Sequence, residues 1–126
     1  TSIAFSCNPE INDLNKLSMV YLSDIRSLKL CSDLVVLNCC ETGIGTIVKG
    51  EGTLALNRAF TIAGARNIIY TLYEIYDSSS SQLTQLLFTN IFAGQDYATA
   101  LHHAKLQMLE QGYAPVHWAG FVLVGK

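Results

Sequence analysis

Two adjacent thiols, Cys39 and Cys40, come directly after Asn38 and a run of four apolar residues at positions 34–37. A cysteine thiolate is a strong nucleophile that can form a covalent intermediate with an acyl group. The apolar run predicts a strand buried on both faces, and α/β sheets bind ligands beside the carboxyl ends of such strands. Either thiol is therefore a candidate nucleophile.

The same two thiols also fit an inert role. Free cysteine is among the most buried residue types, and apolar surroundings raise the pKa of a thiol. Neighbouring residues of a strand face opposite ways, so only one of Cys39 and Cys40 can face a cleft. Their position alone leaves both roles open.

A glycine-rich segment follows, with four glycines between positions 43 and 52. Glycine permits positive φ and lets backbone approach a ligand closely, as an oxyanion-binding turn requires. Gly45 and Gly50 have the spacing of a phosphate-binding loop, but Glu51 stands where that loop has lysine. Val48 takes the place of the third glycine in the dinucleotide-binding pattern. We therefore expect no nucleotide cofactor, and a Rossmann-type small-molecule binder has only the α/β rhythm in its favour.

The spacing of apolar residues in the rest of the chain predicts alternating strands and helices. A helix between two buried strands makes a right-handed parallel crossover the default arrangement. We expect short strands or extended pieces at 2–6 and 19–22, a helical turn at 24–28, helices at 51–63, 81–92 and 96–111, and further strands at 67–72 and 119–124.

The composition is unusual for a complete domain. The chain has 126 residues, enough for one domain at most. Half of the residues are hydrophobic and 14% are charged, against about 25% charged in typical soluble domains. This charge is too sparse to coat a small particle, so we infer that something outside the sequence covers part of its surface.

Charge and hydropathy also exclude some partners. A net charge of -2 offers no basic surface for DNA or RNA. No apolar run approaches the roughly 20 residues that span a bilayer, so we expect a soluble protein with no membrane contact.

The four cysteines have no C-x-x-C spacing, so we expect no metal site. Adjacent thiols such as Cys39 and Cys40 rarely pair with each other, which favours a reducing, cytoplasmic setting. The chain begins with Thr1, which indicates a fragment or a processed product.

Several motifs in order resemble the CHAT domain, a caspase-related cysteine peptidase domain of clan CD that is often attached to tetratricopeptide repeats. The resemblance covers the chain from about Met19 to its last residue. Asn38 and Cys39 take positions where the family usually has Ser-Ala, and Tyr73 takes that of a tryptophan. The motifs are LVVLNCCETG at 34–43, KGEG at 49–52, AGAR at 63–66, LYEIYD at 72–77 and WAGFVLVG at 118–125.

The resemblance implies an α/β fold: a three-layer caspase-like sandwich with a mostly parallel sheet and helices on both faces, here lacking its first strands. Residues 1–126 would form a single partial domain of this kind. Because the segment 40–43 aligns with the family motif, Cys40 is the implied nucleophile, and the loop with Gly43 and Cys39 is implied to bind the oxyanion. The implied substrate is a protein or peptide, and no cofactor is implied.

The resemblance also points to a pocket for the substrate residue before the scissile bond. In caspase-like peptidases that prefer basic residues, an acidic side chain lines this pocket at about the place of Asp77, with Glu74 as the second candidate. The segment that leads from the carboxyl end of the strand at 67–72 to Asp77 places this residue on the same rim as Cys40. It equally fits a helix N-cap or a first-turn acid before the four serines at 78–81.

A cysteine peptidase needs a histidine that lowers the pKa of its thiol and protonates the leaving amine. None of the three histidines, His102, His103 and His117, resembles the base of the family. In caspases the base precedes the nucleophile by about 50 residues, which from Cys40 runs beyond the start of the chain. We therefore expect the histidine on a preceding segment or a separate polypeptide, and no activity from this chain alone.

Two functions remain open. The first is part of a bacterial-type cysteine peptidase that cleaves after basic residues, with its histidine outside this chain. The alternative is a catalytically incomplete regulatory or assembly module that docks on tetratricopeptide repeats or another sensor domain. The upstream half of the same domain is an expected partner in either case, because it would cover the apolar edge of the sheet.

Overall fold

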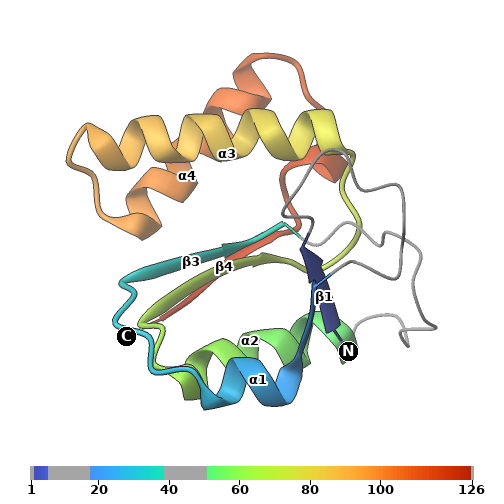
Figure 1. Cartoon of the computed structure of the whole chain (residues 1–126). Helices are drawn as coiled ribbons and strands as arrows, with labels where there is room; N and C mark the ends of the chain where they lie inside the picture. Colours follow the sequence, from blue (N-terminus) through green and yellow to red (C-terminus); the bar gives the residue numbers. More distant parts are fainter. Residues whose placement is uncertain (1, 6–17, 39–50, 126) are drawn as a thin grey trace.

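The computed structural model describes residues 2–5, 18–38 and 51–125 (Figure 1). In this part of the chain a three-stranded sheet separates two layers of helices. The elements are β1 (Ser2–Phe5), β2 (Ser18–Tyr21), α1 (Leu22–Ser27), β3 (Leu34–Leu37), α2 (Glu51–Ala63), β4 (Asn67–Thr71), α3 (Asp77–Phe92), α4 (Tyr97–Glu110), a 3-10 turn (Pro115–His117) and β5 (Phe121–Gly125).

The sheet has the strand order β3-β4-β5 and is mixed. β3 and β4 are parallel with Leu34 opposite Asn67, as the crossover through α2 predicts. β5 runs antiparallel to β4, with Phe121 opposite Thr71. The expectation of a mostly parallel sheet is therefore not met among the described strands, where one of the two pairings is parallel.

The direction of β5 follows from the two helices that precede it. Gln82 of α3 hydrogen bonds to Gln111, and Asn90 further along α3 donates to the Ala100 carbonyl of α4, so the two helices run antiparallel. A pair of antiparallel helices returns the chain to the rim that it left after β4. β5 then starts beside the last residue of β4 and must run in the opposite direction.

Alternation along β4 divides the core between the two helical layers. Ile69 belongs to a cluster with residues of α3 and α4, whereas Ile68 and Tyr70 belong to a cluster with residues of α1 and α2. Helices therefore cover both faces of the sheet, as expected for a three-layer α/β fold. β1 and β2 pair antiparallel in a separate two-stranded sheet.

β3 is less buried than predicted. Leu34, Val35 and Val36 are half-buried and only Leu37 is buried, although a strand buried on both faces was expected. β3 lies at an edge of the described sheet, whereas β4 has a strand on each side. An edge strand lacks a neighbour that would shield its side chains, which explains the difference.

α4 is predicted correctly and α3 is longer than predicted. Asp96 is the N-cap of α4, where its carboxylate accepts from the amides of Ala98 and Thr99. These bonds, and first of all the one from the Thr99 hydroxyl, hold the Asp96 pKa below its usual 3.8. α3 begins at Asp77 and not at 81, so the four serines lie inside the helix.

A lysine of α4 lies against β5, the edge of the described sheet opposite β3. Lys105 of α4 is half-buried, and its Nζ donates to the Phe121 carbonyl of β5 at 2.6 Å. Burial lowers the Lys105 pKa from its usual 10.5.

Among the helices of the described ranges, none is long and apolar enough to cross a membrane.

Two glycines with positive φ provide a matched test of packing around α2. Gly64 ends α2 at φ 110°, and a Cβ there would collide with the carbonyl oxygen of Leu30; Gly94 ends α3 at φ 93° with nothing within 4 Å of the same position. Gly94→Ala should lose about 1–2 kcal/mol of unfolding free energy from backbone strain alone. Gly64→Ala should lose a further 1–3 kcal/mol or so, because Leu30 must move. Urea unfolding measures both, and equal losses would show that the Leu30 contact does not matter.

Candidate functional site

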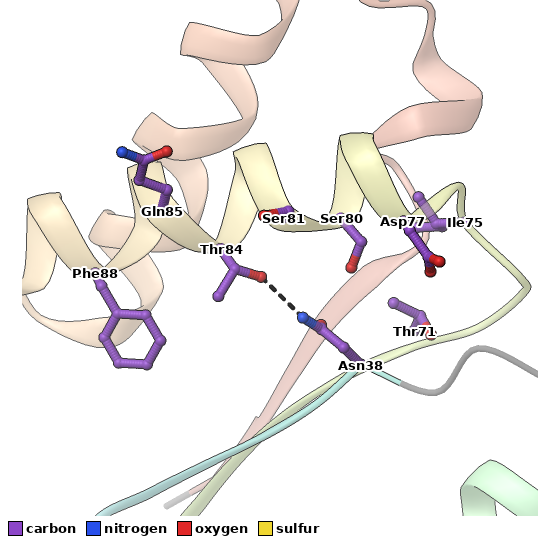
Figure 2. Close-up of a pocket in the computed structure, with 9 residues that line it drawn as sticks. All are labelled: Asn38, Thr71, Ile75, Asp77, Ser80, Ser81, Thr84, Gln85 and Phe88. Atoms are coloured by element: carbon purple, nitrogen blue, oxygen red, sulfur yellow. Dashed lines mark hydrogen bonds between the residues drawn. The ribbon is translucent and has the colours of Figure 1, made fainter. Parts of the chain in front are cut away.

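A pocket of about 480 Å³ lies where the carboxyl ends of β3 and β4 meet one face of α3 (Figure 2). Its walls come from the residue after β3, the last residue of β4, the loop that follows and the first three turns of α3. The described lining residues are Asn38, Thr71, Ile75, Asp77, Ser80, Ser81, Thr84, Gln85 and Phe88. The predicted rim, at the carboxyl ends of β3 and β4, therefore contains a pocket.

α3 contributes a regular stripe to this pocket. Its lining residues start at Asp77 and end at Phe88, with spacings of three and four residues that place them on one side of a helix. Leu83 and Leu87 lie on the other side and belong to the buried core. One face of α3 thus packs in the core and the other lines the pocket. The side chains on the pocket face are mostly hydroxyl and amide.

Asn38 ties the end of β3 to α3. Its Nδ2 donates to Thr84 Oγ1 at 3.0 Å, as drawn in Figure 2. Asn38 is the last described residue before Cys39 and Cys40. This contact joins the strand end that precedes the two thiols to the wall of the pocket.

Asp77 supplies charge to the pocket. It is the only charged side chain among the described lining residues, and Figure 2 shows its carboxyl group directed toward Thr71. The same residue occupies the first turn of α3, while Tyr76 is the N-cap position. Asp77 therefore fulfils the first-turn alternative and lines a pocket at the same time. Glu74 is exposed and is not among the described residues that line it.

Packing at the end of the sheet positions the loop that leads to Asp77. The Leu72 amide donates to the Gly120 carbonyl at 2.9 Å, which extends the β4–β5 pairing by one step. The Tyr73 ring lies against Gly120 so closely that a Cβ there would come within 2.7 Å of the ring. Gly120 thus accommodates the tyrosine that stands where a tryptophan was expected.

The three predicted catalytic-loop residues, Cys40, Cys39 and Gly43, lie outside the described residues. The described free thiol, Cys31, is exposed in the segment before β3 and does not line the pocket. Across the described ranges no group of three or more His, Cys, Asp and Glu side chains is arranged to hold a metal ion.

The histidines have other contacts. His102 and His103 are exposed on α4, and His103 Nδ1 lies 2.9 Å from Gln95 Oε1. His117 Nδ1 lies 2.7 Å from the hydroxyl of Ser79, a buried residue in the first turn of α3. The rings of Tyr76 and Tyr113 each lie 5.7 Å from the His117 ring. His117 thus fixes the start of α3 to the 3-10 turn, and it does not line the pocket.

Comparison with known families assigns most of the chain to one of them. The profile of the CHAT domain matches residues 7–126. The chain belongs to the CHAT domain family. The resemblance stated from the motifs is thereby confirmed for the CHAT domain itself.

Two curated proteins match this CHAT domain over 106 residues at 29% identity: tetratricopeptide repeat protein 28 of mouse and the human protein of the same name. The match covers 82% of this chain and 4% of each relative. The chain therefore spans a small part of the length of these relatives.

Sequence reasoning found one of the pocket residues and missed the others. The sequence indicates Asp77 through the family resemblance but gives no comparable signal for Thr84, Gln85 and Phe88, because the prediction of that helix depends on the apolar residues of its other face. The polar stripe has the same helical period and becomes visible once the helix is extended back to Asp77. Asn38 gave no signal beyond its departure from the usual family motif.

The Asn38–Thr84 contact can be tested with a double-mutant cycle. Asn38→Ala and Thr84→Val should each lower the unfolding free energy of the CHAT domain. The double variant should lose about 0.5–1 kcal/mol less than the sum of the two single losses, because both substitutions remove the same hydrogen bond. Thr89→Val provides the control, since Thr89 donates to the Gln85 carbonyl on the same helix and has no bond to Asn38. Urea unfolding of the two cycles measures the coupling. Full additivity of Asn38→Ala with Thr84→Val would rule the contact out.

Proposed function

We propose that this CHAT domain carries the nucleophile and the primary specificity pocket of a caspase-like cysteine peptidase. The observation that supports the proposal is the pocket at the carboxyl ends of two parallel strands, with Asp77 on its wall and Asn38 at its edge. Asn38 precedes Cys40 by two residues. Ligand sites of α/β sheets are found at this end of the strands.

In the proposed reaction the Cys40 thiolate attacks the carbonyl carbon of a peptide bond. The negative charge that develops on the carbonyl oxygen would be stabilised by backbone amides of the loop with Gly43 and Cys39. A histidine from outside this chain would take the thiol proton and give it to the leaving amine. Water would then hydrolyse the thioester, release the acid and restore the thiol.

Asp77 supports a preference for a basic residue before the scissile bond. A carboxylate in a pocket otherwise lined by hydroxyl, amide and apolar groups attracts a guanidinium or ammonium group and can accept its hydrogen bonds. Glu74 is exposed outside the described lining, which makes it the weaker of the two candidates.

The partners proposed here follow from the sheet and from the relatives. β3 is an edge of the described sheet, which suits pairing with a strand from the upstream half of the same domain. The relatives are named for tetratricopeptide repeats, so we include a repeat or similar sensor domain among the proposed partners. Adjacent thiols such as Cys39 and Cys40 rarely pair with each other, which supports a reducing, cytoplasmic setting.

A regulatory or assembly module is the second candidate. All three histidines belong to the described residues, and none of them lines the pocket. A domain of this fold without an imidazole beside its thiol would bind a partner or peptide without cleaving it. The alkylation rate of Cys40 separates the two candidates, because a paired thiolate reacts faster than an ordinary thiol.

The nucleophile is tested in a longer protein that supplies a histidine-bearing upstream segment. Cys40→Ala should lower cleavage of a peptide by at least about 10³-fold, because the covalent step is lost. Cys39→Ala should keep most of the activity and is the matched control. Iodoacetamide should label Cys40 faster than Cys39. Preferential labelling of Cys39, or activity that survives Cys40→Ala, would assign the chemistry elsewhere.

The specificity pocket is tested with Asp77→Asn in the same longer protein. kcat/KM for a peptide with arginine before the scissile bond should fall roughly 10- to 100-fold, as expected for the loss of a charged hydrogen bond. A peptide with glutamine there should be affected little. Glu74→Gln removes a nearby exposed charge and should leave both peptides unchanged. An equal loss in the two acidic variants would point to a general electrostatic effect and not to the pocket.

A further inference from the structure

The pocket extends along α3 well beyond Asp77, and its part along this helix is called the groove below. Asp77 and Phe88 lie at opposite ends of the row of lining side chains in Figure 2. At a rise of about 1.5 Å per residue, the helix between them spans roughly 16 Å. A basic side chain held at Asp77 therefore leaves the far part of the groove for other groups.

The far end is aromatic. Phe88 lines the groove and is 37% exposed, and Phe92, one turn further along α3, is 84% exposed. Their rings stack with centroids 6.2 Å apart. The two neighbouring phenylalanines thus form a continuous apolar surface at the end of the pocket.

The middle of the groove is polar and uncharged. Ser81 and Gln85 line it between the two ends, beside Thr84, whose hydroxyl accepts from Asn38 Nδ2. Hydroxyl and amide groups both donate and accept hydrogen bonds, as the backbone of an extended peptide requires. The groove thus offers a carboxylate, then hydrogen-bonding groups, then an aromatic surface, in that order.

We propose that Phe88 and Phe92 form a second recognition subsite, which takes an apolar side chain about five residues from the basic residue held at Asp77. An extended chain advances roughly 3.3 Å per residue, so about five residues cover the groove. The occupant is a segment of the peptide substrate, because its charge complements Asp77 and its backbone matches the polar middle. The inference rests on the proposed function for the identity of the basic residue.

The test is a binding measurement with fluorescent peptides. One pair of probes holds arginine with phenylalanine five residues before it or five residues after it, separated by glycine and serine. In a second pair serine replaces the phenylalanine. Fluorescence anisotropy should show about tenfold tighter binding for one phenylalanine probe than for its serine counterpart, as expected for burial of one aromatic side chain.

Variants of the protein assign the effect to the groove. Phe88→Ser should abolish the gain from the phenylalanine, so that each phenylalanine probe binds no tighter than its serine counterpart. Leu109→Ser removes an exposed apolar side chain from α4 and should leave the gain intact. Circular dichroism checks that each variant is folded. A gain that persists in Phe88→Ser, or no gain in either probe, overturns the second subsite.

The binding readout separates this inference from the peptidase proposal. Binding that depends on Phe88, without cleavage in the longer histidine-bearing protein, would refute the peptidase and leave the subsite in place. Cleavage after arginine that is indifferent to Phe88 and to the distant phenylalanine would refute the subsite and leave the peptidase in place.

Discussion

The structure depends on the burial of β4 from both sides. Ile69 packs toward α3 and α4, and its neighbours Ile68 and Tyr70 pack toward α1 and α2. A strand that is apolar on both faces needs a helical layer on each. The three layers are therefore set by a few residues of one strand, and the other elements take positions relative to it.

The antiparallel pair α3 and α4 then assembles the site. α3 leaves the rim at which β4 ends, and α4 returns to it, so the 3-10 turn lies beside the first turn of α3. The hydrogen bond between Ser79 and His117 joins the two ends of this excursion. The same first turn carries Asp77, so contacts behind the helix hold the charged end of the pocket in place.

The fold was predictable where the signal is local. The existence of strand β3, the α2 period and the Asp96 cap of α4 each depend on neighbouring residues, and the structure confirms them. The start of α3 was wrong because serine is a weak helix former, and only tertiary contacts reveal that Ser79 is buried. The direction of β5 was missed for a related reason, since it follows from how two helices pack and not from the apolar run itself.

The candidate site was predictable in part. Asp77 was found through resemblance to a family, and the pocket around it was not, because its wall combines a strand end with a helix face from distant parts of the chain. Asn38 and Thr84 are 46 residues apart in the sequence and meet only in the folded protein. Cys40 remains a prediction that depends on the family motif.

Lys105 makes the two edges of the described sheet different from each other. Its half-buried ammonium group is bonded to a carbonyl of β5, the strand at one edge of the described sheet. An incoming strand on that side would have to displace a charge from a partly desolvated position, whereas β3 on the other side contains no charged residue. The charge thus disfavours addition of a strand beside β5, and within the described sheet it leaves β3, the strand that leads to the two thiols, as the less obstructed edge.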